Sequence, residues 1–416
     1  IDEMNWRHNT PRHRLALDSI ADHRDLQKRR PAQAVGFYGS LTATVPRLFQ
    51  LAKFYKGLDL PTVAGGAHVD ALPEEALGEG IDIVVHGEGE LKVVDILKAF
   101  SGKKKISDVR GISFVDDDGN VMRTDDRKPV CDLNQLPIPM LETMVEVRRP
   151  ISIIPFERTR GCNFNCEFCI VHDRFGPSRA ASPERVASEI EQRVDEGYRT
   201  FFCVDDNFTQ GRDSTIELCK MIQDIQKRKK CRLEFTVQVR SSVGRDKELM
   251  TALRAAGVSI LAIGLESPIS EELEGMSKHQ TPEQIERDVR NLRSHGFMIH
   301  GMFIFGYPLE DTVAAARLTL RERADKYIEF IRRTAIDTIQ VMKPVPVPGS
   351  RLAKRLKEQG RILPLKLVGW DKYDGSYLTF LPDAGISAAE LQKQATRILQ
   401  RFYNPFNFLK FPMLVF

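Results

Sequence analysis

The sequence predicts an α/β protein with two domains built on parallel sheets and a small, mostly helical C-terminal region. Short apolar runs typical of buried strands alternate with amphipathic helical stretches over most of the 416 residues. Turn signals and prolines interrupt the alternation between about residues 101 and 150. Near residue 350 the alternation ends, and helical patterns and aromatic residues replace it. We therefore expect domains over residues 1–135, 136–345 and 346–416.

The first predicted domain is a doubly wound α/β unit. Strands are expected at residues 34–38, 62–66 and 81–85, with one helix ending near Lys56 and another near Phe100. The turns after these strands lie at one edge of such a sheet. A Rossmann dinucleotide site is the alternative, but no G-x-G-x-x-G follows the first strand, which disfavours it.

Both ends of this domain carry further signals. The chain begins Ile1-Asp2-Glu3, without an initiator Met, and this start is typical of the end of a strand. We therefore expect the native protein to be longer at its N-terminus. Asp116 to Gly119 predicts a hairpin turn, and the prolines of Leu136 to Pro139 predict a linker into the next domain.

The second domain is predicted as a partial parallel barrel of six βα units. Strands are expected at residues 151–156, 200–204, 233–239, 260–265, 299–305 and 338–342. Helix signals lie between them: Ser182-Pro183 starts one helix, Gly257 ends another, and Thr281 to Gln284 forms a capping box. Ligands of such sheets bind beyond the C-terminal ends of the strands.

Three cysteines follow the first barrel strand with C-x3-C-x2-C spacing: Cys162, Cys166 and Cys169. Three thiolates on a [4Fe-4S] cluster leave one iron open for another ligand. Zinc is the alternative, with His172 as the nearest candidate for a fourth ligand. Disulfides are disfavoured, because seven cysteines in 416 residues is sparse and no signal peptide is recognisable at the start.

Polar residues follow several of the other barrel strands, where a bound ligand would lie. They are Asp205, Asp206, Asn207, Arg240, Glu266, Ser267 and the run Gly306-Tyr307-Pro308. Each alone is also explained as a loop residue that caps the next helix. Their repetition around one barrel favours a binding site.

With its cysteine loop between a strand and a helix, this domain resembles the radical S-adenosylmethionine (SAM) enzymes. The resemblance implies that SAM chelates the open iron and that Phe168 lies against the adenine. It implies that the Asp205-Asp206-Asn207 end contacts the methionine amine and that Arg240 pairs with the carboxylate. Glu266, with Ser267 beside it, would contact the ribose, and residues 345–350 would line the adenine.

The first domain resembles the cobalamin-binding domain that some of these enzymes carry. The turn after the first strand and a glycine pair make room there for the nucleotide tail, since a Cβ would collide with it. The D-x-H-x-x-G motif that supplies a cobalt ligand is absent, and we interpret His8 and His68 as surface or loop histidines. The candidate cobalamin contacts are Tyr38, Ser40, Leu41, Thr42, Gly65, Gly66, His68 and Glu88.

Together these resemblances imply a cobalamin-dependent radical SAM methyltransferase, similar to the class B enzymes and their relatives. Its 5′-deoxyadenosyl radical would remove a substrate hydrogen, and methylcobalamin would then methylate an unactivated carbon or a phosphorus centre. The alternatives are radical cyclisation, rearrangement or coupling without net methylation, and a corrinoid-free member whose first domain is an interaction module. The implied partners are a small-molecule substrate and an electron donor such as flavodoxin or ferredoxin.

Composition excludes other classes of protein. The net charge is +4, and the basic run Lys227 to Lys230 is interpreted as a solvated helix end, so no nucleic-acid partner is expected. No apolar run approaches the ~18 residues of a transmembrane helix, and a cytoplasmic location is expected. The aromatic tail, residues 401–416, either packs on the barrel or serves as an apolar substrate wall or a peripheral membrane contact.

Overall fold

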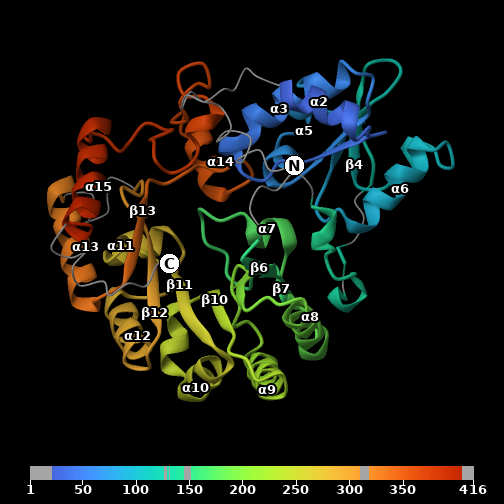
Figure 1. Ribbon diagram of the computed structural model, residues 1–416. Coiled ribbons are helices and arrows are strands. Elements are labelled where there is room, and N and C mark those ends of the chain that lie inside the picture. Colours follow the sequence, from blue (N-terminus) through green and yellow to red (C-terminus); the bar gives the residue numbers. More distant parts are fainter. Residues whose placement is uncertain (1–20, 126–128, 131, 145–150, 310–317, 405–416) are drawn as a thin grey trace. The chain divides into compact units, whose positions relative to one another are not determined.

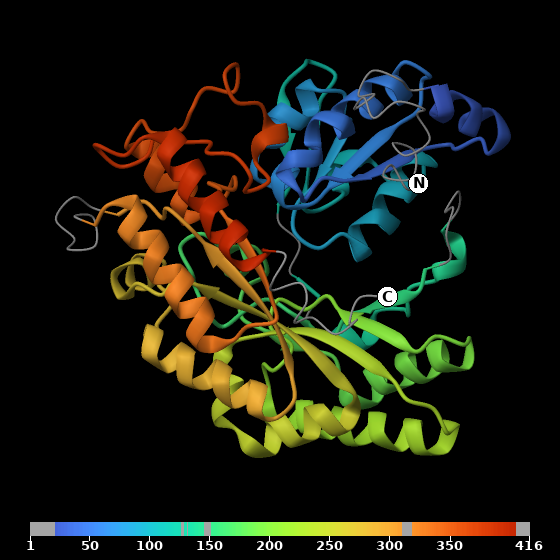
Figure 2. The same ribbon diagram turned by 60° about the vertical axis from the view of Figure 1, so that its left-hand side comes forward.

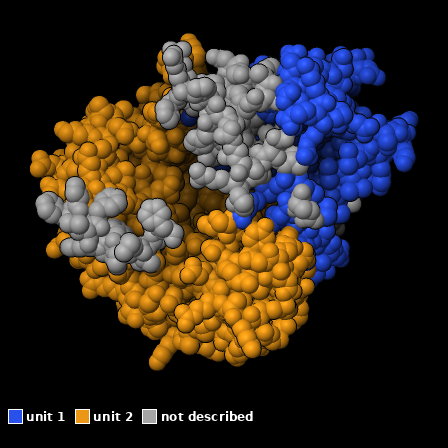
Figure 3. All heavy atoms as spheres, in the orientation of Figure 1, with its two compact units in different colours: residues 1–151, 369–371 blue, residues 152–368, 372–416 orange. Residues whose placement is uncertain are grey.

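The computed structural model describes residues 21–125, 129–130, 132–144, 151–309 and 318–404. The chain divides into two compact units, one of residues 1–151 with 369–371 and one of residues 152–368 with 372–416 (Figure 3). Among the helices in the described ranges, none is both long and apolar enough to cross a membrane.

The first unit contains a five-stranded sheet in the order β1-β2-β3-β4-β5. The first three strands are parallel and confirm the predicted strands, while the predicted hairpin adds β4 and β5 antiparallel to the same sheet. The strands are β1 Val35–Tyr38, β2 Thr62–Gly65, β3 Ile83–Val85, β4 Ile112–Val115 and β5 Val121–Arg123.

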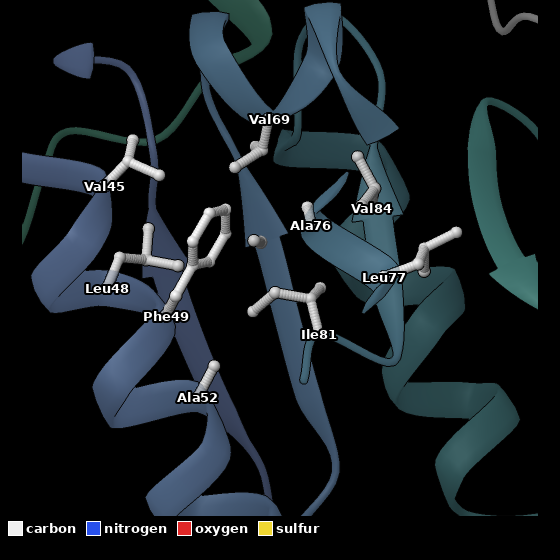
Figure 4. Close-up of a cluster of buried hydrophobic side chains, with 10 residues drawn as sticks. Val45, Leu48, Phe49, Ala52, Val69, Ala76, Leu77, Ile81 and Val84 are labelled. Carbon is white, nitrogen blue, oxygen red and sulfur yellow. The ribbon is translucent and has the colours of Figure 1, made fainter. Parts of the chain in front are cut away.

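The helices of this unit provide the apolar stripe that covers the sheet. Val45, Leu48, Phe49 and Ala52 recur at helical spacing on α3 and pack toward β3 residue Val84 (Figure 4). All five of these side chains are buried. The helices are α2 Ala21–Arg29, α3 Val45–Lys56, α4 Ala67–Ala71, α5 Pro73–Gly78 and α6 Glu90–Phe100.

The two glycines that end β2 have different structural roles. Gly66 has a φ of 125°, and a Cβ on it would lie 2.5 Å from the Gly39 carbonyl carbon and 2.6 Å from the Ser40 nitrogen. The backbone turn after β1 therefore requires this glycine whatever ligand is bound. A Cβ on Gly65 would lie 3.6 Å from the Val85 Cβ, an ordinary contact.

The second unit contains six parallel strands in the order β13-β12-β11-β10-β9-β6, and all six predicted barrel strands are confirmed. Helices α8, α9, α10, α12 and α13 lie along the outside of this sheet (Figures 1 and 2). The strands are β6 Ile153–Phe156, β9 Thr200–Cys203, β10 Glu234–Val239, β11 Val258–Glu266, β12 Met298–Ile304 and β13 Thr338–Met342. The helices are α8 Pro183–Asp195, α9 Arg212–Lys229, α10 Lys247–Ala256, α12 Pro282–Ser294 and α13 Leu320–Thr334.

The predicted helix ends hold in the structure. The Ser182 side chain caps α8, and Thr281 and Gln284 form the reciprocal bonds of a capping box at the start of α12. Gly257 ends α10 in the left-handed conformation, with a φ of 96°. These local signals fix where α8 and α12 begin and where α10 ends.

Shorter elements complete the second unit and include the helical C-terminal region. Helix α15 lies beside α13 (Figure 2). Residues 405–416 of the aromatic tail lie outside the described residues. The elements are β7 Thr159–Arg160, α7 Val171–Phe175, β8 Arg179–Ala180, α11 Ser270–Gly275, α14 Arg351–Glu358 and α15 Ala388–Phe402.

The glycine pair allows a direct test of the first unit. Gly66→Ala should destabilise the protein by about 3 kcal/mol, because it combines a strained φ with a backbone collision. Gly65→Ala is the matched control, and its free energy of unfolding should lie within about 1 kcal/mol of the wild-type value. Denaturant unfolding measures both, and equal stability of the two variants would contradict the assigned role of Gly66.

Candidate active site

The three cysteines lie on one loop between β6 and α7. All three are free thiols; Cys166 is buried, while Cys162 and Cys169 are partly exposed. The short β7–β8 hairpin closes the loop by pairing Thr159 with Ala180. The loop thus presents its thiols from the C-terminal end of β6, as the sequence predicts.

The surroundings of two of the three thiols disfavour the ionised form. Burial, together with the neighbouring thiols and Asp206, raises the pKa of Cys162 and raises that of Cys169 to about 12. Among the residues that the structure describes, no three His, Cys, Asp or Glu side chains form a ready site for a metal ion. The cluster assignment therefore depends on the donor set, because three adjacent soft thiols suit iron–sulfur chemistry. His172, the zinc alternative, lies with Nδ1 2.7 Å from the Cys162 carbonyl oxygen.

A carboxylate inside the cysteine motif clamps the loop. Glu167 accepts two hydrogen bonds from Arg355 of α14, at 2.7 and 2.9 Å, and a third from the Tyr307 hydroxyl. Its backbone also bonds on both sides, to Met276 and to Leu352, each at 3.0 Å. Burial and the adjacent Glu167 raise the pKa of Tyr307, so the phenol stays protonated as a donor.

Asp205 joins the end of β9 to the start of the cysteine loop. Its buried carboxylate accepts hydrogen bonds from the Arg158 and Thr159 backbone nitrogens, at 2.8 and 2.9 Å, and from the Thr159 hydroxyl, at 2.7 Å. Burial raises the pKa of Asp205, although these bonds oppose the rise. Both oxygens of this predicted SAM contact are thus occupied within the protein.

The rest of the Asp205-Asp206-Asn207 run differs in its surroundings. The protein around Asp206 reduces its hydration, and this, together with the charges of Asp205 and Glu157, raises its pKa to about 6, although part of the residue remains exposed. Asn207 is buried, and its Oδ1 accepts a hydrogen bond of 3.1 Å from the Thr209 hydroxyl. Asp206 is exposed and is therefore the more accessible of the two carboxylates.

Arg240 and Glu266 are held by one loop, residues 276–280. Arg240 donates through Nη2 to the Lys278 carbonyl oxygen at 2.7 Å and to Gln280 Oε1 at 3.0 Å. Its guanidinium lies 3.8 Å from the centre of the Phe164 ring, inside the cysteine motif. Glu266, with a φ of 60°, pairs through Oε1 with Lys278 Nζ at 2.9 Å.

The remaining predicted SAM contacts of this unit differ in burial and in hydrogen bonding. The Ser267 hydroxyl donates to Glu272 and accepts from the Ile269 nitrogen at 3.0 Å, so it is occupied at the start of α11. Phe168 is half-buried. Ser350, at the end of the predicted adenine-side run 345–350, caps α14.

The candidate residues of the first unit divide into exposed and buried groups. Tyr38 and Leu41 are 78% and 68% exposed at the C-terminal end of β1. The Ser40 hydroxyl accepts from the Ala67 nitrogen at 3.0 Å, and Glu88 accepts from the Val130 nitrogen at 2.6 Å. Gly65 and Gly66 lie at the end of the neighbouring strand β2.

The interpretation of His68 as a surface or loop histidine is wrong. It lies fully buried on α4, with Nδ1 3.3 Å from the Thr42 hydroxyl and Nε2 3.3 Å from Glu75. The Trp370 ring meets it edge-on at 4.8 Å, and its Nε1 donates to Glu75 at 2.7 Å. Burial alone would raise the pKa of Glu75, but the bonds from His68 and Trp370 hold it below its usual value. His8 lies outside the described residues.

Sequence reasoning missed several residues that shape the site. Glu167 could have been found, because it lies inside the cysteine motif. Arg158 precedes the loop, is fully buried and donates to the Phe208 and Gln210 carbonyls at 2.6 and 3.0 Å. Lys278 and Arg355 carry no local signal, since their partners are distant in the sequence.

Comparison with known proteins identifies the barrel. The radical SAM superfamily model matches residues 156–319. An uncharacterized methyltransferase from Pyrococcus horikoshii is 28% identical over 345 residues, 80% of this chain and 71% of that protein. An anaerobic magnesium-protoporphyrin IX monomethyl ester cyclase from Rubrivivax gelatinosus is 27% identical over 379 residues, 88% of this chain and 64% of that protein.

Two solved structures share the fold over most of the chain. TsrM from Kitasatospora setae, with cobalamin and a [4Fe-4S] cluster bound, aligns with a TM-score of 0.70 at 18% identity, covering 90% of this chain and 81% of that chain. The second structure is OxsB, a cobalamin-dependent S-adenosylmethionine radical enzyme with aqua-cobalamin and S-adenosylmethionine bound. It aligns with a TM-score of 0.67 at 16% identity, covering 92% of this chain and 60% of that chain.

The barrel matches the radical SAM superfamily over residues 156–319, and the protein is an enzyme whose cofactors are a [4Fe-4S] cluster and SAM. Its particular architecture is that of TsrM and OxsB, a doubly wound α/β unit followed in the chain by a partial barrel. The predicted fold class is therefore confirmed.

The cysteines give the first test of the site. Cys162→Ala, Cys166→Ala and Cys169→Ala should each abolish formation of 5′-deoxyadenosine from SAM, because each removes one of the three predicted cluster ligands. Cys231→Ala is the matched control. Substitution of Cys203 or Cys219 would be less suitable, because both are fully buried and their replacement would also perturb the core. Chromatography of anaerobic reactions measures the product, and full activity in any of the three variants would contradict the assignment.

The clamp on Glu167 gives a second test. Arg355→Met should destabilise the loop by about 1–3 kcal/mol, because it removes two of the three donors to the largely buried Glu167 carboxylate and leaves only the Tyr307 hydroxyl. Reconstituted protein should then lose iron faster than wild type under a chelator. Lys354→Met, exposed on the same helix, is the control. Equal rates of iron loss in both variants would show that the clamp does not support the cluster loop.

Proposed function

We propose that the protein is a cobalamin-dependent radical SAM methyltransferase. The observation that carries the proposal is the three-thiol loop in a chain that shares its fold with the cobalamin-bound TsrM structure over 90% of its length. Several relatives are methyltransferases by name, including those from Pyrococcus horikoshii and Chlorobaculum tepidum. The chain spans 71% of the first of these and 78% of the second.

The first unit is the proposed cobalamin site. Tyr38 and Leu41 present exposed apolar area at the end of β1, which a large, flat corrinoid would cover. Gly65, next to them on β2, has no Cβ to obstruct a close approach. Both ring nitrogens of His68 lie within hydrogen-bond distance of Thr42 and Glu75, so this chain supplies no histidine to cobalt from α4.

The second unit is the proposed SAM site. The methionine end of SAM would lie near Asp206 and Arg240, whose guanidinium suits a carboxylate. Glu266 would accept hydrogen bonds from the ribose, and Phe168 would lie against the adenine. When bound, the cofactors supply the homolytic cleavage and the methyl group, and the residues of this chain bind, orient and exclude water.

The substrate is proposed to be a small molecule, and the aromatic C-terminal tail favours an apolar one. Flavodoxin or ferredoxin is the proposed class of electron donor, because the cluster must be reduced before SAM is cleaved. Cyclisation without methylation is the second candidate, favoured by the 27% identity to the Rubrivivax gelatinosus cyclase.

Methyl transfer to cobalamin can be tested without the substrate. Protein reconstituted anaerobically with iron, sulfide and hydroxocobalamin, then reduced and given SAM with a labelled methyl group, should transfer the label to the bound cobalamin. Leu41→Asp should lower the cobalt content about tenfold while iron is retained, because it places a charge on the apolar contact surface. Leu97→Asp, at an exposed position on α6, is the control. Cobalamin bound without methyl transfer would favour the cyclase, and equal cobalt in wild type and Leu41→Asp would contradict the proposed site.

A further inference from the structure

We propose that Lys278 is a positioning residue for SAM, which holds the Glu266 carboxylate for the ribose and fixes Arg240 through its backbone. The inference rests on the proposed SAM contacts of Glu266 and Arg240 and deepens them. Lys278 lies in the loop between α11 and α12, twelve residues after Glu266.

Glu266 and Lys278 form a buried ion pair. Their charged atoms are 2.9 Å apart, and the side chains are 9% and 7% exposed. Removing two charges from water costs much of what their attraction returns, so such a pair is a poor means of stabilising a fold. Its location at a candidate ligand contact favours a role in binding.

The backbone of β11 is shaped around this pair. A β-bulge interrupts the pairing with β12 between Gly264 and Glu266, and Glu266 itself has a φ of 60°. A Cβ on Gly264 would lie 2.3 Å from Glu266 Oε1 and 3.2 Å from Lys278 Nζ. The irregular pairing of β11 and the missing side chain at Gly264 therefore make room for the two charged groups.

Lys278 reaches both candidate SAM contacts at once. Its ammonium binds Glu266, and its carbonyl oxygen accepts from Arg240 at 2.7 Å. Its neighbours Ser277 and His279 have φ values of 55° and 53°, left-handed conformations that cost energy in residues other than glycine. With this backbone conformation, the side chain of Lys278 reaches Glu266 while its carbonyl oxygen faces Arg240.

The pair also fits the chemistry of ribose recognition. An ionised carboxylate accepts stronger hydrogen bonds from hydroxyl groups than a neutral acid does. The Lys278 ammonium, bound at Oε1, holds the buried Glu266 carboxylate in one orientation. Without it, the carboxylate would lose this partner and turn away, and the ribose would lose its acceptor.

The test measures SAM affinity by anaerobic calorimetry on reconstituted, unreduced protein. Lys278→Met should weaken SAM binding about tenfold with iron and sulfide content unchanged. His279→Asn is the matched control in the same loop, because Asn tolerates the left-handed conformation, and it should bind SAM as wild type does. Lys278→Arg, which keeps the charge, should recover part of the lost affinity.

A double-mutant cycle separates this inference from the proposed function. Glu266→Gln should itself weaken SAM binding, and in that background Lys278→Met should change the affinity by less than about threefold. Wild-type affinity in Lys278→Met, independent effects of the two changes, or loss of the cluster in Lys278→Met would overturn the role of Lys278. Wild-type affinity in Glu266→Gln would instead show that the proposed ribose contact is wrong.

Discussion

The hydrogen bonds to the Asp205 carboxylate are the interaction on which the cysteine loop depends. The loop has little regular structure of its own, yet its thiols must stay together when no metal holds them. Asp205 lies just after β9 and accepts three hydrogen bonds from Arg158 and Thr159, which follow the neighbouring strand β6. One buried carboxylate thereby fixes the loop to the sheet. Both of its oxygens accept hydrogen bonds within the protein, so the exposed Asp206 is the carboxylate of that run that is more available to a ligand.

The far side of the loop is held by groups from distant parts of the chain. Glu167 receives Arg355 from α14, and Phe164 stacks against Arg240 from the end of β10. Charged partners on rigid helices and strand ends restrict the loop more than its own backbone could. Preorganisation of this kind lets binding energy act on the cofactor rather than on ordering the protein.

Local sequence signals sufficed for the elements and for the cysteine motif. Alternating apolar runs gave the strands, and Ser182, Thr281 and Gly257 gave helix ends, because these effects act within a few residues. The partners of Glu266 and Glu167 could not be predicted, since pairing across β/α units depends on the folded barrel. His68 was misjudged for the same reason: Trp370, about three hundred residues later, covers it. Gly66 was predicted for a ligand, but its local backbone already requires glycine.

The central claim is that three thiols of this chain hold a cluster with one iron open to SAM. Electron paramagnetic resonance of anaerobically reconstituted, reduced protein tests it most directly, with and without SAM. The account predicts about four irons and four sulfides per chain, and a reduced-cluster signal that changes when SAM is added. A cluster signal that SAM leaves unchanged, or zinc in place of iron, would contradict it.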